Sequence, residues 1–149
     1  MEFTDTVRLV IENKEQSVYT IAAGDTVYRA LEQLSQYGIG AMMVKDGEKI
    51  VGILSERDYA RKIALRGLDS HHVRVQDIMT DEVVVASPDD TIETCMRLLM
   101  ENRIRHLPVI ENGNLLGVIT AGDLMRWIMG RQGETIEHLK HYIEGGYVR

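Results

Sequence analysis

Two aspartates, Asp58 and Asp123, each follow a hydroxyl residue by three positions in two copies of one short motif. The copies read GILSERD, from Gly52, and GVITAGD, from Gly117, and they lie 65 positions apart. A hydroxyl residue at a helix start with a carboxylate three positions later can form a capping box, which is worth about 1 kcal/mol. The same carboxylate can accept both hydroxyls of a ribose, and each charge-assisted hydrogen bond is worth about 1.5 to 3 kcal/mol when sheltered from water. The motif by itself favours capping.

The neighbours of the two aspartates carry the same two interpretations. Ser55 and Thr120 are helix caps in the first, and hydroxyl contacts to ribose or phosphate in the second. Gly52 and Gly117 leave the strand bare where a base or another backbone approaches closely.

The motifs belong to a duplication that covers most of the chain. The halves align without a gap at the offset of 65, and apolar positions match apolar positions, as duplication of one folding unit requires. Each half begins with a β-rich stretch, at 17–21 and 82–86, and continues with apolar residues at helical spacing. These are Val27, Ala30, Leu31 and Leu34 in the first half, and Ile92, Cys95, Met96 and Leu99 in the second. Gly38 is expected to close the first helix, and Asp90 with Glu93 predicts a capping-box start for the second.

Two hairpins follow the predicted helices. Asp46-Gly47 and Asn112-Gly113 predict tight turns in which both central residues adopt positive φ. A further helix follows each motif, so each half reads β-α-β-β-α. A unit of about 50 residues buries too little apolar surface alone, so the two sheets are expected to pack on each other. The predicted fold is α+β, with two repeats related by a pseudo-two-fold axis, sheets face to face, helices outside, and a helix at each terminus.

The predicted organisation has five segments. They are an N-terminal helix or lead-in (1–16), a first repeat (17–68), a linker (69–81), a second repeat (82–130), and a C-terminal helix and tail (131–149). The terminal helices are predicted from the spacing of Val7, Val10 and Ile11 at one end and of Ile136, Leu139 and Ile143 at the other.

The composition narrows the class of partner. A net charge of −6 repels phosphate backbones and anionic lipid surfaces, so neither nucleic acid nor a membrane is expected, although a local basic pocket is allowed. Cys95 is the only cysteine and cannot form an internal disulfide, and the first residues lack the plan of a secretory signal, so we expect a cytoplasmic protein. His138 and His141 lie one turn apart on the terminal helix, but a solvated face explains them, and no metal is predicted.

The ordered set of these features resembles a tandem pair of cystathionine-beta-synthase (CBS) domains. The resemblance rests on TIAAGDTVYRAL, YGIGAMMV and GILSERDYARKI in the first half, on VASPDDTIETCM, NRIRHLPVI and GVITAGDLMRWI in the second, and on a linker ending in DIMT. It covers roughly residues 7 to 130. It implies a protein without catalytic activity that binds an adenine nucleotide as a regulatory signal in a cleft between the repeats.

The resemblance also implies which residues bind the nucleoside. Asp58 and Asp123 are the ribose-binding candidates. In similar proteins the adenine lies between the end of the first strand and the start of the second strand of a repeat. The adenine-pocket candidates are Thr20, Ile21, Ala22, Ile39, Gly40 and Ala41 in the first repeat, and Val85, Ala86, Ser87 and Ile104 in the second. Ordinary core packing explains the apolar members of this set as well.

The second repeat has cations where the first has glycine and alanine. In similar proteins this position supplies cations to nucleotide phosphates, often across the cleft from the ribose aspartate of the other repeat. The resemblance thus implies that a ligand anchored by Asp58 points its phosphates at Arg105 and His106, with Arg103 as a weaker candidate. The alternative is that Arg105 and His106 are an exposed pair on a strand edge, or that His106 is a core histidine whose hydrogen bonds are satisfied. The two sites are not expected to fill equally.

The expected function is a non-enzymatic sensor. AMP or a related adenosine ligand (ADP, ATP or NAD(H)) would change how the protein pairs with an unidentified client protein. A homodimer is expected, because CBS pairs commonly associate through their helices, which would put Tyr59, Trp127 and the terminal helix near a subunit interface. Two alternatives stay open: a purely structural dimerisation module with empty clefts, and a small nucleotide hydrolase, for which the sequence offers no P-loop and no nucleophile-base pair.

Overall fold

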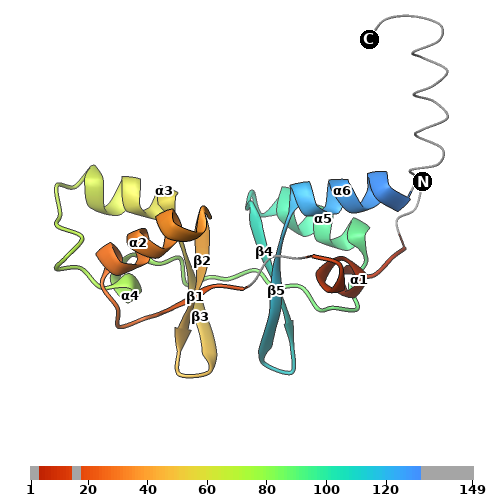
Figure 1. The fold of residues 1–149 in the computed structure, drawn as a ribbon, viewed down its shortest axis with the longest axis horizontal. Helices are drawn as coiled ribbons and strands as arrows, with labels where there is room; N and C mark the ends of the chain where they lie inside the picture. The colour runs from red at the N-terminus through yellow and green to blue at the C-terminus, as the bar shows by residue number, and fades with distance from the viewer. Residues whose placement is uncertain (1–3, 15–17, 132–149) are drawn as a thin grey trace, which may run out of the picture.

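The computed structural model describes residues 4–14 and 18–131, which form two similar halves placed side by side (Figure 1). The first half contains β1 (Thr20–Ala22), α2 (Val27–Tyr37), β2 (Ala41–Asp46), β3 (Lys49–Ser55), α3 (Glu56–Tyr59) and a π-helical turn, η1 (Ala60–Ala64). The second contains α5 (Ile92–Glu101), β4 (His106–Glu111), β5 (Asn114–Thr120) and α6 (Ala121–Arg131). Two further helices, α1 (Val7–Glu12) and α4 (Val75–Ile78), precede the halves. The C-terminal helix predicted from Ile136, Leu139 and Ile143 lies outside the described residues.

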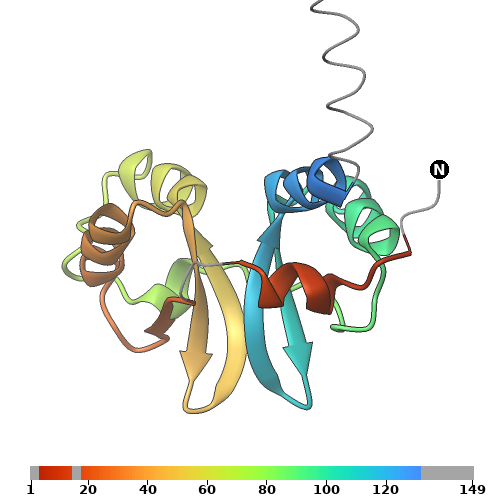
Figure 2. The ribbon, with the colours of Figure 1, turned by 45° about the vertical axis from the view of Figure 1, so that its right-hand side comes forward.

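Each half holds one small sheet. β1 runs parallel to β2, β2 runs antiparallel to β3, and β4 runs antiparallel to β5. The two hairpins lie against each other in the centre with the helices outside (Figure 2). Three consecutive residues are buried in β2 (42–44) and in β4 (107–109), although neighbours in a strand point to opposite faces. Both faces are therefore covered, one by helices of the same half and one by the other half, and the predicted α+β fold is confirmed.

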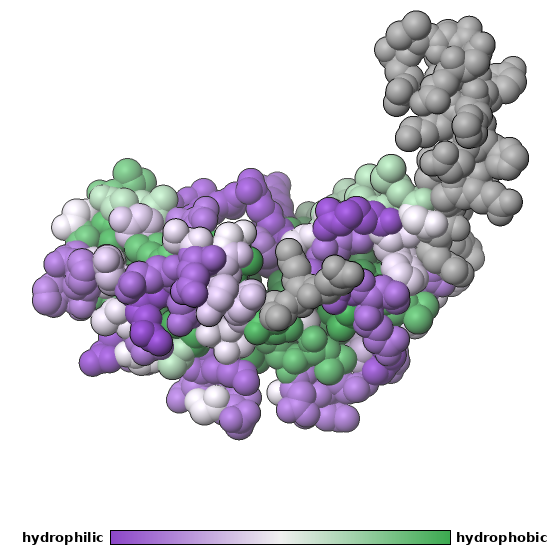
Figure 3. Space-filling view, viewed as in Figure 1, coloured by the Kyte–Doolittle hydropathy of each residue, from purple (hydrophilic) through white to green (hydrophobic). Residues whose placement is uncertain are grey.

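The helix before each half packs on the opposite half. In α1, Val7 belongs to the core of the second half, and its N–H donates to Asp90 O at 2.8 Å. In α4, Val75 belongs to the core of the first half, and its N–H donates to Asp25 O at 2.8 Å. The core of each half therefore includes residues from the helix that precedes the other half in the sequence. This exchange of helices holds the two halves together. Apolar residues reach the surface between the halves, whereas the two hairpin tips are hydrophilic (Figure 3).

The prediction of a strand at 82–86 is wrong, because this stretch makes only an isolated bridge to β4 at its last residue. In the first half the parallel ladder between β1 and β2 begins at the pair Thr20 and Met43. It ends at the hydrogen bond that Ala23 N donates to Lys45 O. The positions that correspond to Met43 and Ala23, 65 residues later, are Pro108 and Pro88, which are the two prolines of the chain. Proline has no N–H to donate, so the parallel ladder cannot extend on either side of the bridge.

Both hairpins form, but their turns differ. Asn112 and Gly113 have φ of 52° and 81°, as predicted for the second hairpin. In the first, β2 continues through Asp46, and the turn residues are Gly47 and Glu48, of which only Gly47 has a positive φ, 63°. The strand pairing places the turn at corresponding positions in both halves, so glycine comes first in one turn and second in the other. The prediction that Asp46 is a central turn residue is therefore wrong by one position.

Helix ends follow local chemistry, with one correction. Gly38 ends α2 with φ of 64°, as expected. The N-cap of α5 is Thr91, whose side chain accepts a hydrogen bond from Thr94 N at 3.2 Å. The predicted cap, Asp90, instead accepts a bond from Ser87 N at 2.9 Å, so it orders the preceding turn.

Candidate functional site

Two clefts lie between the halves, one beside each motif aspartate. The cleft that contains Asp58 has a volume of about 500 Å³, and the cleft that contains Asp123 about 290 Å³. We name them the Asp58 cleft and the Asp123 cleft. Gly40, Ile53 and His106 line both, so the two clefts share a wall.

Asp58 forms a capping box and keeps one oxygen loosely engaged. Its Oδ2 accepts hydrogen bonds from Ser55 N at 3.0 Å and from Ser55 Oγ at 3.1 Å, while Asp58 N donates to Ser55 Oγ at 3.2 Å. Its Oδ1 has only longer contacts, to Thr80 Oγ1 at 3.3 Å and to Lys62 Nζ at 3.4 Å. The capping interpretation is thus confirmed, and Oδ1 is the oxygen best able to accept a further donor.

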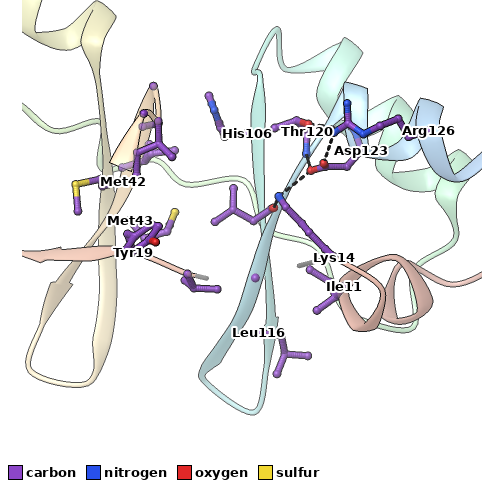
Figure 4. Close-up of a pocket in the computed structure, with 18 residues that line it drawn as sticks. Ile11, Lys14, Tyr19, Met42, Met43, His106, Leu116, Thr120, Asp123 and Arg126 are labelled. Carbon is purple, nitrogen blue, oxygen red and sulfur yellow. Dashed lines mark hydrogen bonds and ion pairs between the residues drawn. The ribbon is translucent and has the colours of Figure 1, made fainter. Parts of the chain in front are cut away.

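Asp123 caps α6 in the same way but is fully engaged by cations (Figure 4). Its Oδ2 accepts bonds from Thr120 N at 2.9 Å and from Lys14 Nζ at 2.8 Å, and its Oδ1 accepts one from Arg126 Nη2 at 2.7 Å. Burial would raise the pKa of Asp123, but the bonds from Lys14 and Thr120 outweigh it and lower the pKa below its ordinary value. Asp123 is therefore ionised at neutral pH.

The Asp58 cleft has basic residues from both halves. Its lining includes Arg57, Arg61 and Lys62 from the helical segments after β3, and Arg103, Arg105 and His106 from the second half, beside the carboxylates of Glu56, Asp58 and Glu82. Burial lowers the pKa of His106, and the charges of Lys14 and Arg105 lower it further against the opposing effect of Asp123. His106 is therefore neutral at pH 7.

The structure brings some predicted site residues to the clefts and leaves others outside. The Asp123 cleft is lined by Ile39, Gly40, Ala41 and Thr120, and the Asp58 cleft by Ser55, Arg103, Ile104, Arg105 and His106. Neither lining includes Thr20, Ile21, Ala22, Val85, Ala86 or Ser87. Ile21 and Ala86 instead lie in the two cores, 3% and 2% exposed. The cleft walls come from residues a few positions earlier, at 18–19 and 82–84, before each chain segment enters its core.

Sequence reasoning missed four residues that contact the aspartates: Lys62 and Arg126 lie one helical turn after their aspartate, whereas Lys14 and Thr80 come from outside the motifs. Lys14 lies two positions after α1 and reaches Asp123, and Thr80 lies two positions after α4 and reaches Asp58. Because each helix packs on the opposite half, the residue that follows it arrives at the motif of that half. Thr80 ends the DIMT segment, so the sequence contained a signal for its position. Lys14 is 109 positions from Asp123, and no sequence signal predicted that the two would meet.

Both motif glycines lie where another part of the chain packs closely against the strand. A Cβ at Gly52 would lie 2.5 Å from Met79 Sδ and 2.9 Å from the backbone oxygen of Thr80. A Cβ at Gly117 would lie 2.5 Å from Ile11 Cδ1. The prediction that another backbone approaches is therefore confirmed at Gly52, whereas at Gly117 a side chain approaches.

Tyr59 and Trp127 lie partly buried against the core of their own half, and Trp127 Nε1 donates to Asp5 Oδ2 at 3.0 Å. Cys95 is fully buried, and burial, with a contribution from Asp90, raises its pKa to about 11, so a thiolate nucleophile is not available at neutral pH.

Within residues 4–14 and 18–131, no group of three or more His, Cys, Asp or Glu side chains is placed to hold a metal ion. No helix in this part of the chain is long and apolar enough to cross a membrane. His138 and His141 lie outside it.

Comparison with known proteins gives one consistent result. A family model described as CBS domain matches residues 11–65 and 75–130. The CBS domain-containing protein CBSX3, mitochondrial, of Arabidopsis thaliana is 40% identical over 128 residues, which are 83% of this chain and 62% of that protein. A protein with CBS domains from Burkholderia ambifaria has a similar structure, with a TM-score of 0.80 and 40% identity over 86% of this chain and 96% of that one. The hexameric CBS-CP12 protein from bloom-forming cyanobacteria matches with a TM-score of 0.72 and 29% identity over 83% of this chain and 68% of that one.

Proposed function

Because this chain belongs to the CBS domain family and carries two copies of the domain, we propose that it is a regulatory module that binds an adenosine ligand and has no catalytic activity of its own. The ligand is AMP or a related molecule, namely ADP, ATP or NAD(H). The observation that carries the proposal is the Asp58 cleft, where a helix-capping carboxylate faces a set of cations across the boundary between the repeats.

Each part of such a ligand has a matching wall in the Asp58 cleft. The ribose hydroxyls donate to Asp58 Oδ1, whose present contacts are long, and Ser55 and Thr80 add hydroxyl groups beside it. The adenine ring lies against the apolar side chains of Val84 and Ile104. About 500 Å³ is within the range of ordinary small-molecule sites.

Phosphates lie toward Arg105 and His106, with Arg103 behind them. Arginine binds phosphate bidentately, and a phosphate beside His106 would favour its protonated form against the burial that disfavours it. Arg57, Arg61 and Lys62 supply further charge for a second or third phosphate. The Asp123 cleft is the second site of the same kind, with Thr120 as its hydroxyl residue and Ile39, Gly40 and Ala41 in its adenine wall.

The regulatory output is a change in association. The outer helices carry exposed apolar side chains, including Tyr28 (41% exposed), Met125 (50%) and Met129 (54%), which supports a homodimer or a docking surface for a client protein. A ligand shifts such an equilibrium only by its difference in affinity for the two arrangements. We propose a cytoplasmic location, whereas the relative from Arabidopsis thaliana is described as mitochondrial.

The experiment is a calorimetric titration of the full chain with AMP, ADP, ATP and NAD(H). Asp58→Ala is expected to weaken binding to its cleft by about tenfold to a hundredfold, since one or more charge-assisted bonds are lost. The matched control is Asp77→Ala, which removes another capping carboxylate, at α4, that lines neither cleft. Both substitutions should cost about 1 kcal/mol of stability, but only the first should weaken binding.

No binding of any of the four ligands to the wild-type chain would refute the proposal. Equal binding by wild type and Asp58→Ala would assign the carboxylate to capping alone. Light scattering with and without ligand tests whether the ligand changes the association of the protein. A monomer under both conditions would refute the homodimer.

A further inference from the structure

Lys14 contacts Asp123, the residue proposed to bind a ribose in the Asp123 cleft. Its Nζ donates to Asp123 Oδ2 at 2.8 Å and to Val118 O at 2.7 Å. The pair is sheltered, since the side chains of Lys14 and Asp123 are 19% and 10% exposed. Figure 4 shows the lysine side chain reaching across β5 to the carboxylate, among the residues that line the cleft.

The Asp58 cleft has no equivalent contact of this strength. Its lysine, Lys62, is 3.4 Å from Asp58 Oδ1 and is 35% exposed, and it makes its shorter bond, 2.8 Å, to Ile78 O. The hydroxyl of Thr80 is 3.3 Å from the same oxygen and carries no charge. Lys14 is bonded to Oδ2 of Asp123, the oxygen that also caps α6, while Arg126 is bonded to Oδ1 at 2.7 Å. A ribose whose two hydroxyls donate to both oxygens of the carboxylate therefore displaces long contacts and one hydroxyl at Asp58, but must displace an ammonium group from Oδ2 at Asp123.

We propose that Lys14 determines the selectivity between the two clefts, acting as an internal competitor for the ribose position of Asp123. This inference rests on the proposed function. A nucleoside donates both ribose hydroxyls to Asp123 only after one of them replaces the ammonium donor at Oδ2, so the Asp58 cleft fills first and the Asp123 cleft fills at higher ligand concentration. Arg126 adds little to this barrier, because its side chain is 73% exposed and can turn into water.

A different role for Lys14 gives the opposite expectation. If its ammonium group bound a ligand phosphate in place, its removal would weaken the binding of AMP and leave adenosine, which has no phosphate, unaffected. Adenosine therefore isolates the competition for the carboxylate from any contact with phosphate.

The experiment titrates adenosine and AMP into Asp58→Ala protein, in which the Asp123 cleft is the site measured. Adding Lys14→Met should tighten adenosine binding on the order of tenfold, because one sheltered charge-assisted bond no longer opposes it. Lys14→Gln is the second variant; it keeps a donor for Val118 O but no charge, and should tighten binding in the same direction. The matched control, Lys62→Met in Asp123→Ala protein, should change adenosine binding by less than about threefold, since the ion pair that it removes is long and partly exposed.

Unchanged or weaker adenosine binding in both Lys14 variants would overturn the proposal, as would an equal gain in the Lys62 control. Thermal unfolding of each variant shows that the fold is kept. Failure of the proposed function has a separate signature, because wild-type protein would then bind no adenosine ligand even through the Asp58 cleft, which Lys14 does not line.

Discussion

Replacing Gly52 with alanine tests the close packing behind the first motif. The added Cβ would lie 2.5 Å from Met79 Sδ, 2.9 Å from Met79 Cγ and 2.9 Å from Thr80 O. The methionine side chain can rotate away, but the backbone oxygen is fixed by a two-bond bridge in which Ile53 N donates to Thr80 O and Thr80 N donates to Ile53 O, both at 2.9 Å. The linker therefore cannot retreat without stretching both bonds.

The magnitude follows from these two effects. Overpacking of a filled site costs about 1 to 3 kcal/mol, and weakening two backbone bonds adds about 1 kcal/mol or more. The lower entropy of the unfolded alanine chain returns about 0.5 kcal/mol. We expect Gly52→Ala to lower the free energy of unfolding by about 1.5 to 3.5 kcal/mol. It should also weaken adenosine binding in the Asp58 cleft, because Thr80 contacts Asp58.

Gly117→Ala is the matched control, since its Cβ would meet only the end of the flexible Ile11 side chain, at 2.5 Å. Its expected cost is about 1 kcal/mol. Urea unfolding of both variants and of the double variant Gly52→Ala, Met79→Ala measures the difference. An equal loss in the two single variants, or full rescue by Met79→Ala, would refute the role given to the Thr80 backbone.

Three further predictions follow from individual side chains. Wild-type protein should lose stability relative to His106→Gln as the pH falls below about 6.5, because the folded-state pKa of His106 is lowered and the unfolded chain takes up the proton first. Urea unfolding of both proteins at several pH values measures the difference. Parallel curves of unfolding free energy against pH would contradict the prediction. Cys95, buried and with its pKa raised to about 11, should react with a thiol-specific disulfide reagent at pH 8 only when urea unfolds the chain; rapid reaction of the folded protein would show that the thiol is accessible. Gly38→Ala should lower the free energy of unfolding by about 1 to 2 kcal/mol, because the φ of Gly38 is 64°. Gly40→Ala should leave stability unchanged, because no heavy atom lies within 4 Å of its Cβ, but it should weaken ligand binding in both clefts. Thermal unfolding measures the first effect and calorimetric titration the second.

The local parts of the candidate site were predictable because they depend on near neighbours in the chain. Ser55 and Asp58 are three positions apart, so their capping box follows from the helix geometry alone. The same holds for the left-handed end of α2 at Gly38 and for the repeat itself. Arg105 and His106 were found because the two halves could be compared position by position.

Errors arose where a residue's partner is distant in sequence. The predicted strand at 82–86 failed because Pro88 and Pro108 remove donors that face each other only after the strands pair. The adenine pocket stays a prediction: Ile39, Gly40, Ala41 and Ile104 line the clefts, whereas the candidates at 20–22 and 85–87 lie outside both linings. Only the packed structure shows where the chain leaves the cleft wall and enters the core, as at Ile21.

The sequence by itself determined the duplication, the α+β fold, the two capping aspartates, and the presence of Arg105 and His106 where the first repeat has Gly40 and Ala41. The tertiary structure alone decided which partner each aspartate receives, because α1 and α4 pack on opposite halves and carry Lys14 and Thr80 with them. Two motifs with nearly the same local geometry thus acquire different electrostatics, since a charged donor at 2.8 Å engages Asp123 where a neutral hydroxyl at 3.3 Å meets Asp58. Long-range packing sets this difference, and local sequence patterns do not encode it.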